Sequence, residues 1–134
     1  AWHTRFHSIT LRYMYNPIFT VFSQLLVGDT LMGESTVDND FNSGFIAAVY
    51  SMTPYTLAAR ADWYQVNDYD NYALDPNGSS GRAFTISAGR NISEHFSLTA
   101  EWQINSGTQQ NLRFFQDSEH FTEHLFQLAL TATF

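Results

Sequence analysis

Apolar and polar residues alternate one by one along several stretches of this chain. In residues 96–105 every even position is apolar and every odd position is polar. Residues 125–134 repeat the pattern, with apolar side chains at all the even positions up to Phe134. A repeat of two residues places alternate side chains on opposite faces of a β-strand, so both stretches are predicted to be strands whose two faces meet different surroundings.

Five further strands follow from weaker versions of the same pattern. Residues 9–15, 56–64 and 83–90 alternate in the same way, whereas residues 18–28 and 43–52 are apolar at both parities. In those two stretches, β-branched and aromatic content and the spacing indicate strands, but the hydrophobic pattern leaves their register open. The sequence therefore predicts seven strands, at residues 8–15, 18–29, 42–52, 55–66, 83–91, 96–106 and 122–134.

The predicted connections alternate between short and long. Short links fall at Asn16-Pro17, at Thr53-Pro54 and at residues 91–95. Long links, rich in Asp, Asn, Gly and Ser, fall at about residues 30–42, 67–82 and 106–121. Short turns on one side and long loops on the other are typical of outer-membrane barrels. The predicted fold class is therefore all-β, an antiparallel up-and-down transmembrane β-barrel of which this chain forms about seven strands.

The charged residues indicate which face of these strands meets lipid. In residues 56–64, Arg60 and Asp62 share one face and Ala61 lies on the other. A lipid-facing Arg at the bilayer midplane costs about 2–4 kcal/mol, so the charged face is predicted to line the lumen. The predicted lumen residues are Arg12, Arg60, Asp62, Glu101, Gln103, Asn105 and Gln127. The predicted lipid-facing residues are Leu57, Ala59, Ala61, Trp63, Leu98, Ala100, Trp102, Leu128 and Leu130.

Two interpretations of Arg60 and Asp62 stay open. The two residues are about 7 Å apart along a strand, so they can interact with each other or with neighbouring strands. One interpretation is a structural ladder across the wall, and the other is a constriction of the pore.

Arg90 is a charged residue that the two-residue alternation places on the lipid face. Beside a turn, however, its guanidinium can extend to the lipid headgroups.

The composition narrows the classes of function. The chain has 12 Phe, 7 Tyr and 3 Trp, no Lys, no Cys, and a formal net charge of −7. An acidic chain with no basic cluster lacks the surface that a nucleic-acid backbone requires, so no nucleic-acid partner is predicted. The absence of cysteine removes disulfides, thiolate nucleophiles and Cys-based metal sites. No apolar run approaches the roughly 18 residues of a membrane-spanning helix.

No motif for catalysis or metal binding is found in the sequence. The pairs Glu119-His120 and Glu123-His124 would suit a metal ion on a helix, but four residues of a strand span about 13 Å, too far to share one ion. The acidic stretch at residues 68–77 departs from the calcium-loop pattern at Tyr72. We therefore predict no catalytic residues, no metal, no cofactor and no enzymatic activity.

The end of the chain carries a resemblance to known proteins. Leu125–Phe134 resembles the C-terminal assembly signal of Gram-negative outer-membrane proteins, and residues 27–33, 37–41 and 95–102 are similar to the C-terminal half of porin-superfamily proteins of the phosphate-selective-porin type. The resemblance implies a place in the bacterial outer membrane, contact with its lipid and lipopolysaccharide, and binding of the final strand by the barrel assembly machinery. It also suggests a homotrimer. The assembly-signal residues it implies are Phe126, Leu128, Leu130 and Phe134.

The predicted function is a porin-like channel for passive diffusion of small hydrophilic solutes, selected by pore width and by charged lumen residues. The alternative is a structural outer-membrane barrel that sheathes or anchors a partner protein without an open pore. A soluble lipid-binding barrel is disfavoured, because it would need apolar residues on the inside.

The strand count indicates that further strands complete the barrel. Counting back from Phe134, whose end is predicted to be periplasmic, places Ala1 outside the cell. A bacterial barrel has an even number of strands and both termini in the periplasm. Residues 1–7 are therefore predicted to be the remnant of an outer loop. We predict that residues 1–134 are the C-terminal segment of one transmembrane barrel domain, and that missing sequence or another chain supplies the remaining strands.

Overall fold

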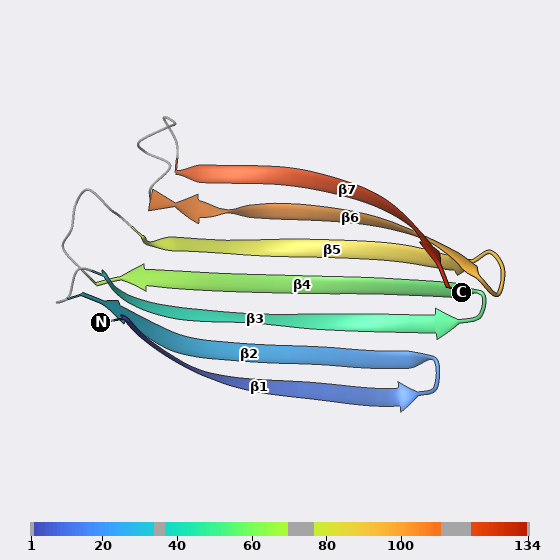
Figure 1. Ribbon diagram of the computed structural model, residues 1–134, viewed down its shortest axis with the longest axis horizontal. Coiled ribbons are helices and arrows are strands. Elements are labelled where there is room, and N and C mark those ends of the chain that lie inside the picture. The colour runs from blue at the N-terminus through green and yellow to red at the C-terminus, as the bar shows by residue number, and fades with distance from the viewer. Residues whose placement is uncertain (1, 34–36, 70–76, 111–118, 134) are drawn as a thin grey trace.

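The computed structural model describes residues 2–33, 37–69, 77–110 and 119–133. It contains one antiparallel sheet of seven strands, which lie side by side in chain order (Figure 1). The predicted number of strands and their up-and-down order are confirmed. The strands are β1 (Trp2–Asn16), β2 (Phe19–Met32), β3 (Val37–Met52), β4 (Tyr55–Asp68), β5 (Ser79–Asn91), β6 (Phe96–Gln109) and β7 (His120–Ala132).

The short and long connections lie at opposite ends of the sheet, as the sequence predicts (Figure 1). The first short turn is held by the Asn16 side chain, whose Oδ1 accepts hydrogen bonds from the backbone N–H of Ile18 at 3.0 Å and of Phe19 at 2.8 Å. Such a bond from an Asn side chain to the backbone two or three residues on replaces a backbone turn bond. At the other end, Gly33 follows β2 with a φ of 72°, a conformation that favours glycine.

All seven strands extend further than predicted at the end of the sheet that carries the long connections. Residues 2–7, predicted to be loop, belong to β1, and Trp2 pairs with Met32 of β2. Residues 30–32, 37–41, 67–68, 79–82, 107–109 and 120–121 are likewise strand. Most of these segments carry polar residues at both parities, so the hydrophobic alternation ends before the strand does. The backbone ladder continues because its hydrogen bonds do not depend on the side chains.

The register sorts the side chains of all seven strands onto two faces. Arg60 pairs with Ala47 of β3 and with Thr85 of β5, so these three share a face, and Ala59 lies opposite them beside Ala48 and Ile86. We call the side that carries Arg60 the polar face and the side that carries Ala59 the apolar face. Over residues 82–90 of β5 the polar-face residues are half-buried and the apolar-face residues are exposed. Side chains crowd together on the inside of a bend, so this difference indicates that the sheet curves toward its polar face.

No hydrophobic side chain is buried in the part of the chain that the structure describes. Leu128 and Leu130 of β7, for example, are 64% and 65% exposed. A soluble sheet buries one face against another layer. This sheet has no second layer among its described residues, so both faces meet the surroundings.

The seven described strands form an open sheet, in which β1 and β7 do not pair with each other. Within the described residues, β1 pairs only with β2 and β7 pairs only with β6. Two strand edges therefore carry backbone groups that have no partner in this sheet. Phe134, the predicted terminal residue of the assembly signal, lies outside the described residues.

Four aromatic rings lie over glycines on neighbouring strands. Each pair is directly opposite in the register, and the ring occupies the space that a glycine Cβ would fill. A Cβ on Gly44, for instance, would lie 2.4 Å from the Trp63 ring, and one on Gly28 would lie 2.5 Å from the Phe41 ring. The four aromatic–glycine pairs are Phe41–Gly28, Trp63–Gly44, Tyr64–Gly81 and Phe121–Gly107.

Candidate functional site

The register brings all seven predicted lumen residues onto the polar face. Arg60 and Asp62 stand on β4, two strands from Gln103 and Asn105 on β6, with Thr85 and Ala83 of β5 between them. Neighbouring strands are about 4.8 Å apart, so the two pairs are separated by roughly 10 Å of backbone. The remaining predicted residues on this face are Arg12 on β1, Glu101 on β6 and Gln127 on β7.

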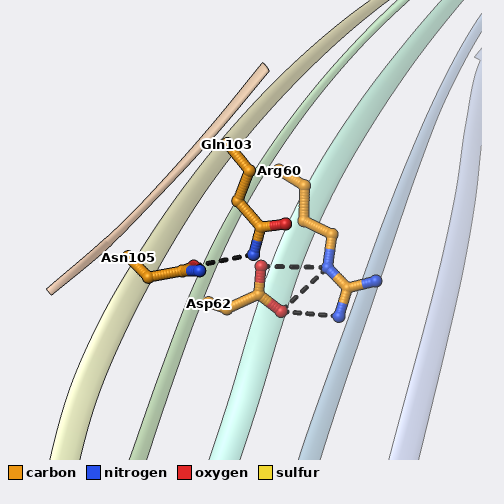
Figure 2. Close-up of polar contacts among 4 residues, drawn as sticks. All are labelled: Arg60, Asp62, Gln103 and Asn105. Atoms are coloured by element: carbon orange, nitrogen blue, oxygen red, sulfur yellow. Dashed lines mark hydrogen bonds and ion pairs between the residues drawn. The ribbon is translucent and has the colours of Figure 1, made fainter. Parts of the chain in front are cut away.

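Arg60 and Asp62 form an ion pair along β4. The Arg60 Nε donates to both carboxylate oxygens of Asp62, at 2.8 and 3.0 Å, and the two side chains point toward one another (Figure 2). The guanidinium also lies 4.2 Å from the centre of the Phe45 ring on β3. The two charges therefore compensate each other within one strand. An exposed pair of this kind contributes at most about 1 kcal/mol to stability.

Gln103 and Asn105 form a second pair of neighbours on one strand. The Gln103 Nε2 donates to the Asn105 Oδ1 at 2.7 Å (Figure 2). Ala83 lies between Asp62 and Asn105 in the register, and its short side chain leaves a hollow that Arg60, Asp62, Ala83 and Asn105 help to line. This part of the polar face therefore offers amide and carboxylate groups around a space that water or a polar solute can enter.

The charges without an ion pair lie at opposite sides of the polar face. Glu101 on β6 lies opposite Ser87 and Gln127, and Glu123 on β7 lies opposite Asn105. Neither carboxylate has a basic partner within ion-pair distance among the described residues. Arg12 on β1 lies over the Phe22 ring, 5.6 Å from its centre. The face is therefore acidic across β6 and β7 and basic at β1.

The prediction missed Glu123 and the phenylalanines of the polar face. Glu123 lies within the predicted strand at residues 122–134 and shares the parity of Gln127, so alternation extended back from residue 125 would have found it. Phe6, Phe41 and Phe121 lie in segments that were predicted to be loop. Phe22 and Phe45 lie in residues 18–28 and 43–52, where apolar residues occupy both parities and no pattern distinguishes the faces.

The apolar face carries a continuous band next to the short turns. On β4 it runs from Tyr55 to Trp63 and is followed by Gln65 and Asn67, which form a hydrogen bond of 2.8 Å. On β6 it runs from Phe96 to Ile104 and is followed by Ser106 and Thr108. All nine predicted lipid-facing residues lie within this band.

Charged residues mark both limits of the apolar band. On β5, Arg90 stands at the turn side and Arg82 at the loop side, with Phe84, Ile86 and Ala88 between them on the same face. Beyond the band, toward the long connections, Arg5 of β1 pairs with Asp29 of β2 at 3.2 Å. The band is therefore bordered by side chains that prefer water.

The Glu-His pairs near β7 do not converge. His120 and His124 lie on the apolar face and Glu123 on the polar face, and the His124 ring stacks on Trp102 with 5.8 Å between ring centres. Within the described ranges, no group of three or more His, Asp or Glu residues could hold a metal ion. No helix in the same ranges is long and apolar enough to cross a membrane.

No family model, no curated protein and no solved structure matches this chain. The similarity to porins therefore stays a prediction from the segments quoted above. Function has to be inferred from the two faces of the sheet.

Proposed function

We propose that this chain forms part of the wall of an outer-membrane β-barrel, with its polar face toward a water-filled pore for small hydrophilic solutes. The observation that supports the proposal most is the combination of an exposed apolar band and an opposite polar face in a sheet with no buried core among its described residues. An exposed apolar surface of this extent is unfavourable in water. In a bilayer it is the favoured arrangement.

The height of the apolar band suits a bilayer. From Tyr55 to Trp63 the β4 backbone makes eight steps of about 3.4 Å, or roughly 27 Å along the strand. A tilt of about 40° reduces this to roughly 21 Å along the membrane normal, close to the 25 Å band of outer-membrane barrels. Arg82 and Arg90 then stand near the two interfaces, where an Arg costs about 0–1 kcal/mol.

Barrel closure requires strands beyond this sheet. In hydrocarbon, each backbone N–H or C=O without a partner costs several kcal/mol. The free edges of β1 and β7 would carry many such groups. In the proposed assembly, polypeptide outside the described sheet pairs with both edges, and the short turns face the periplasm while the long connections face outward.

The first test is single-channel recording of the protein in planar bilayers. We expect steady, stepwise currents in symmetrical salt, because the polar face would leave a continuous water path. The control is the same preparation after heat denaturation, which should give no steps. A correctly inserted protein that carries no steady current would contradict the channel and support the alternative below.

Glu101 is expected to favour cations in the pore. Its carboxylate has no ion-pair partner among the described residues, whereas Asp62 is compensated by Arg60. One charge about 8 Å from a passing ion, in a watery pore, changes the energy of the ion enough to alter permeability about twofold. We expect Glu101→Gln to lower the ratio of potassium to chloride permeability, measured from reversal potentials in a salt gradient, by about that factor. The matched control, Asp29→Asn on the apolar face, should leave the ratio unchanged.

The second candidate function is a structural barrel that sheathes or anchors a partner protein. The observation that favours it is the group of phenylalanines on the polar face of β1 to β3, which could pack against a protein segment inside the barrel. Two of these rings, Phe22 and Phe45, are already in contact with Arg12 and Arg60. Because an arginine already covers each of these two rings, less of their surface is left to pack against a protein segment inside the barrel. The channel is therefore the function that we propose first.

A further inference from the structure

A groove crosses the apolar band on β3 to β6. Its floor consists of four alanines in two directly paired couples, Ala48–Ala59 and Ala88–Ala100. Larger side chains border it, among them Tyr50, Leu57, Trp102 and Phe126. Four adjacent alanines between bulky neighbours leave a channel along the surface that a flexible alkyl chain can occupy.

Arg90 stands at the turn-side end of this groove. It lies on the same face as Ala88 and two residues from it, which is about 7 Å along β5. Its guanidinium contacts the Tyr55 ring, 5.5 Å from the ring centre, and it makes no ion pair with any described residue. The groove therefore joins an apolar channel to a positive charge that has no carboxylate partner in the described sheet.

We propose that the groove and Arg90 form a binding site for one anionic glycerophospholipid. The phosphate lies against the Arg90 guanidinium, whose planar set of donors matches phosphate oxygens. One acyl chain lies over Ala88 and Ala100, against the Trp102 ring. The inference rests on the proposed function, since it places Arg90 at the headgroup level of the leaflet that the short turns face.

The charge pattern favours a lipid over a second protein copy as the occupant. A protein interface of standard size would have to cover Arg90 and supply a carboxylate for it, because an uncompensated buried charge is strongly unfavourable. A lipid supplies an anionic headgroup and an apolar chain in one molecule. Arg82, at the other limit of the band, lies beside Trp63 and is six residues from Ala88 on β5, whereas Arg90 is two residues from it.

Trp102 provides a direct reporter of the groove. The chain has three Trp, so replacing Trp2 and Trp63 by Phe leaves Trp102 as its only one. We would reconstitute this variant in phosphatidylcholine vesicles that contain a small fraction of brominated phosphatidylglycerol or of brominated phosphatidylcholine. Bromine quenches tryptophan fluorescence on contact, so the quenching reports which lipid occupies the groove.

We expect brominated phosphatidylglycerol to associate with the Trp102 site about fivefold more strongly than brominated phosphatidylcholine, the effect of one basic residue at a membrane surface. Arg90→Gln should remove this preference, Ala100→Leu should weaken quenching by both lipids, and Arg82→Gln should leave the preference intact. Equal quenching by the two lipids in the parent variant, or an unchanged preference in Arg90→Gln, would overturn the site. Absence of quenching by either lipid would also overturn it and would indicate a groove covered by protein.

Channel recordings of the same variants separate the two proposals. We expect Arg90→Gln to conduct like the parent, because Arg90 lies on the face away from the pore. A protein that shows the lipid preference without any current would refute the channel and leave the lipid site standing. A conducting protein without the preference would refute the lipid site alone.

Discussion

Replacing Ala59 with arginine is expected to prevent stable insertion of the sheet into a bilayer. Ala59 lies near the middle of the apolar band, between Ala48 and Ile86. In the proposed orientation its side chain points into hydrocarbon, where an arginine near the midplane costs about 2–4 kcal/mol. The loss should be measurable as a lower free energy of unfolding in urea titrations of the protein refolded into lipid vesicles.

Ala58 provides the matched control, because it is the same residue one position earlier on the same strand. Its side chain lies on the polar face, between Val49 and Ser87. Ala58→Arg places the same charge toward water, in the row that also contains Glu101. We expect it to change the free energy of unfolding by less than about 1 kcal/mol. Equal losses in both variants would mean that the apolar face does not meet lipid.

Gly107→Ala is expected to destabilise the pairing of β5 with β6. A Cβ at this position would lie 2.3 Å from the Ser80 carbonyl oxygen and 2.9 Å from the Gly81 Cα. Both are backbone atoms of the neighbouring strand, so the strands would have to separate. Such overpacking costs about 1–3 kcal/mol. The same urea titration in vesicles would measure it.

Gly89 is the comparison position for this second variant. Gly89 lies on β5, on the same face as Gly107 of β6 but next to the short turn. A Cβ on Gly89 would meet only the Thr99 Oγ1 at 3.3 Å, and the next atom would be 3.8 Å away. Gly89→Ala should be close to neutral, because the alanine also restricts the unfolded chain. If Gly107→Ala proved as mild as Gly89→Ala, the close approach of the two backbones would not be a constraint on the sheet.

Much of the fold was predictable because the two-residue alternation in β4 to β7 is strong. In β4 and β6, charged residues such as Arg60 and Glu101 occur at one parity and large apolar residues such as Trp102 at the other, so the grouping of side chains on each face follows from the sequence. The strand ends toward the long connections were wrong, because residues such as Thr30 and Asn67 give no hydrophobic signal even where the backbone ladder continues.

The candidate site was predictable as a set of residues and not as a set of contacts. The spacing of Arg60 and Asp62 allowed partners on either side, and only the structure assigns them to each other. The contact of Arg60 with Phe45 depends on the β3–β4 register, which the apolar sequence of residues 43–52 left open. Glu123 was missed although it lies inside the predicted strand at residues 122–134, because the clear alternation of apolar residues begins only at residue 125.

The aromatic–glycine pairs restrict which alignments of the strands are possible during assembly. Residues 19–28 of β2 and 43–52 of β3 carry no charge and are apolar at both parities, so a slip there would move no charge into an unfavourable place, and hydrophobicity would select the register weakly. Phe41 lies over Gly28, and a slip by two residues would set its ring against Leu26 or Thr30 instead. Trp63 over Gly44 imposes the same condition between β3 and β4. The glycines therefore help to fix the register. In a misaligned sheet the aromatic rings would collide with larger side chains, although the hydrophobic pattern alone would tolerate that alignment.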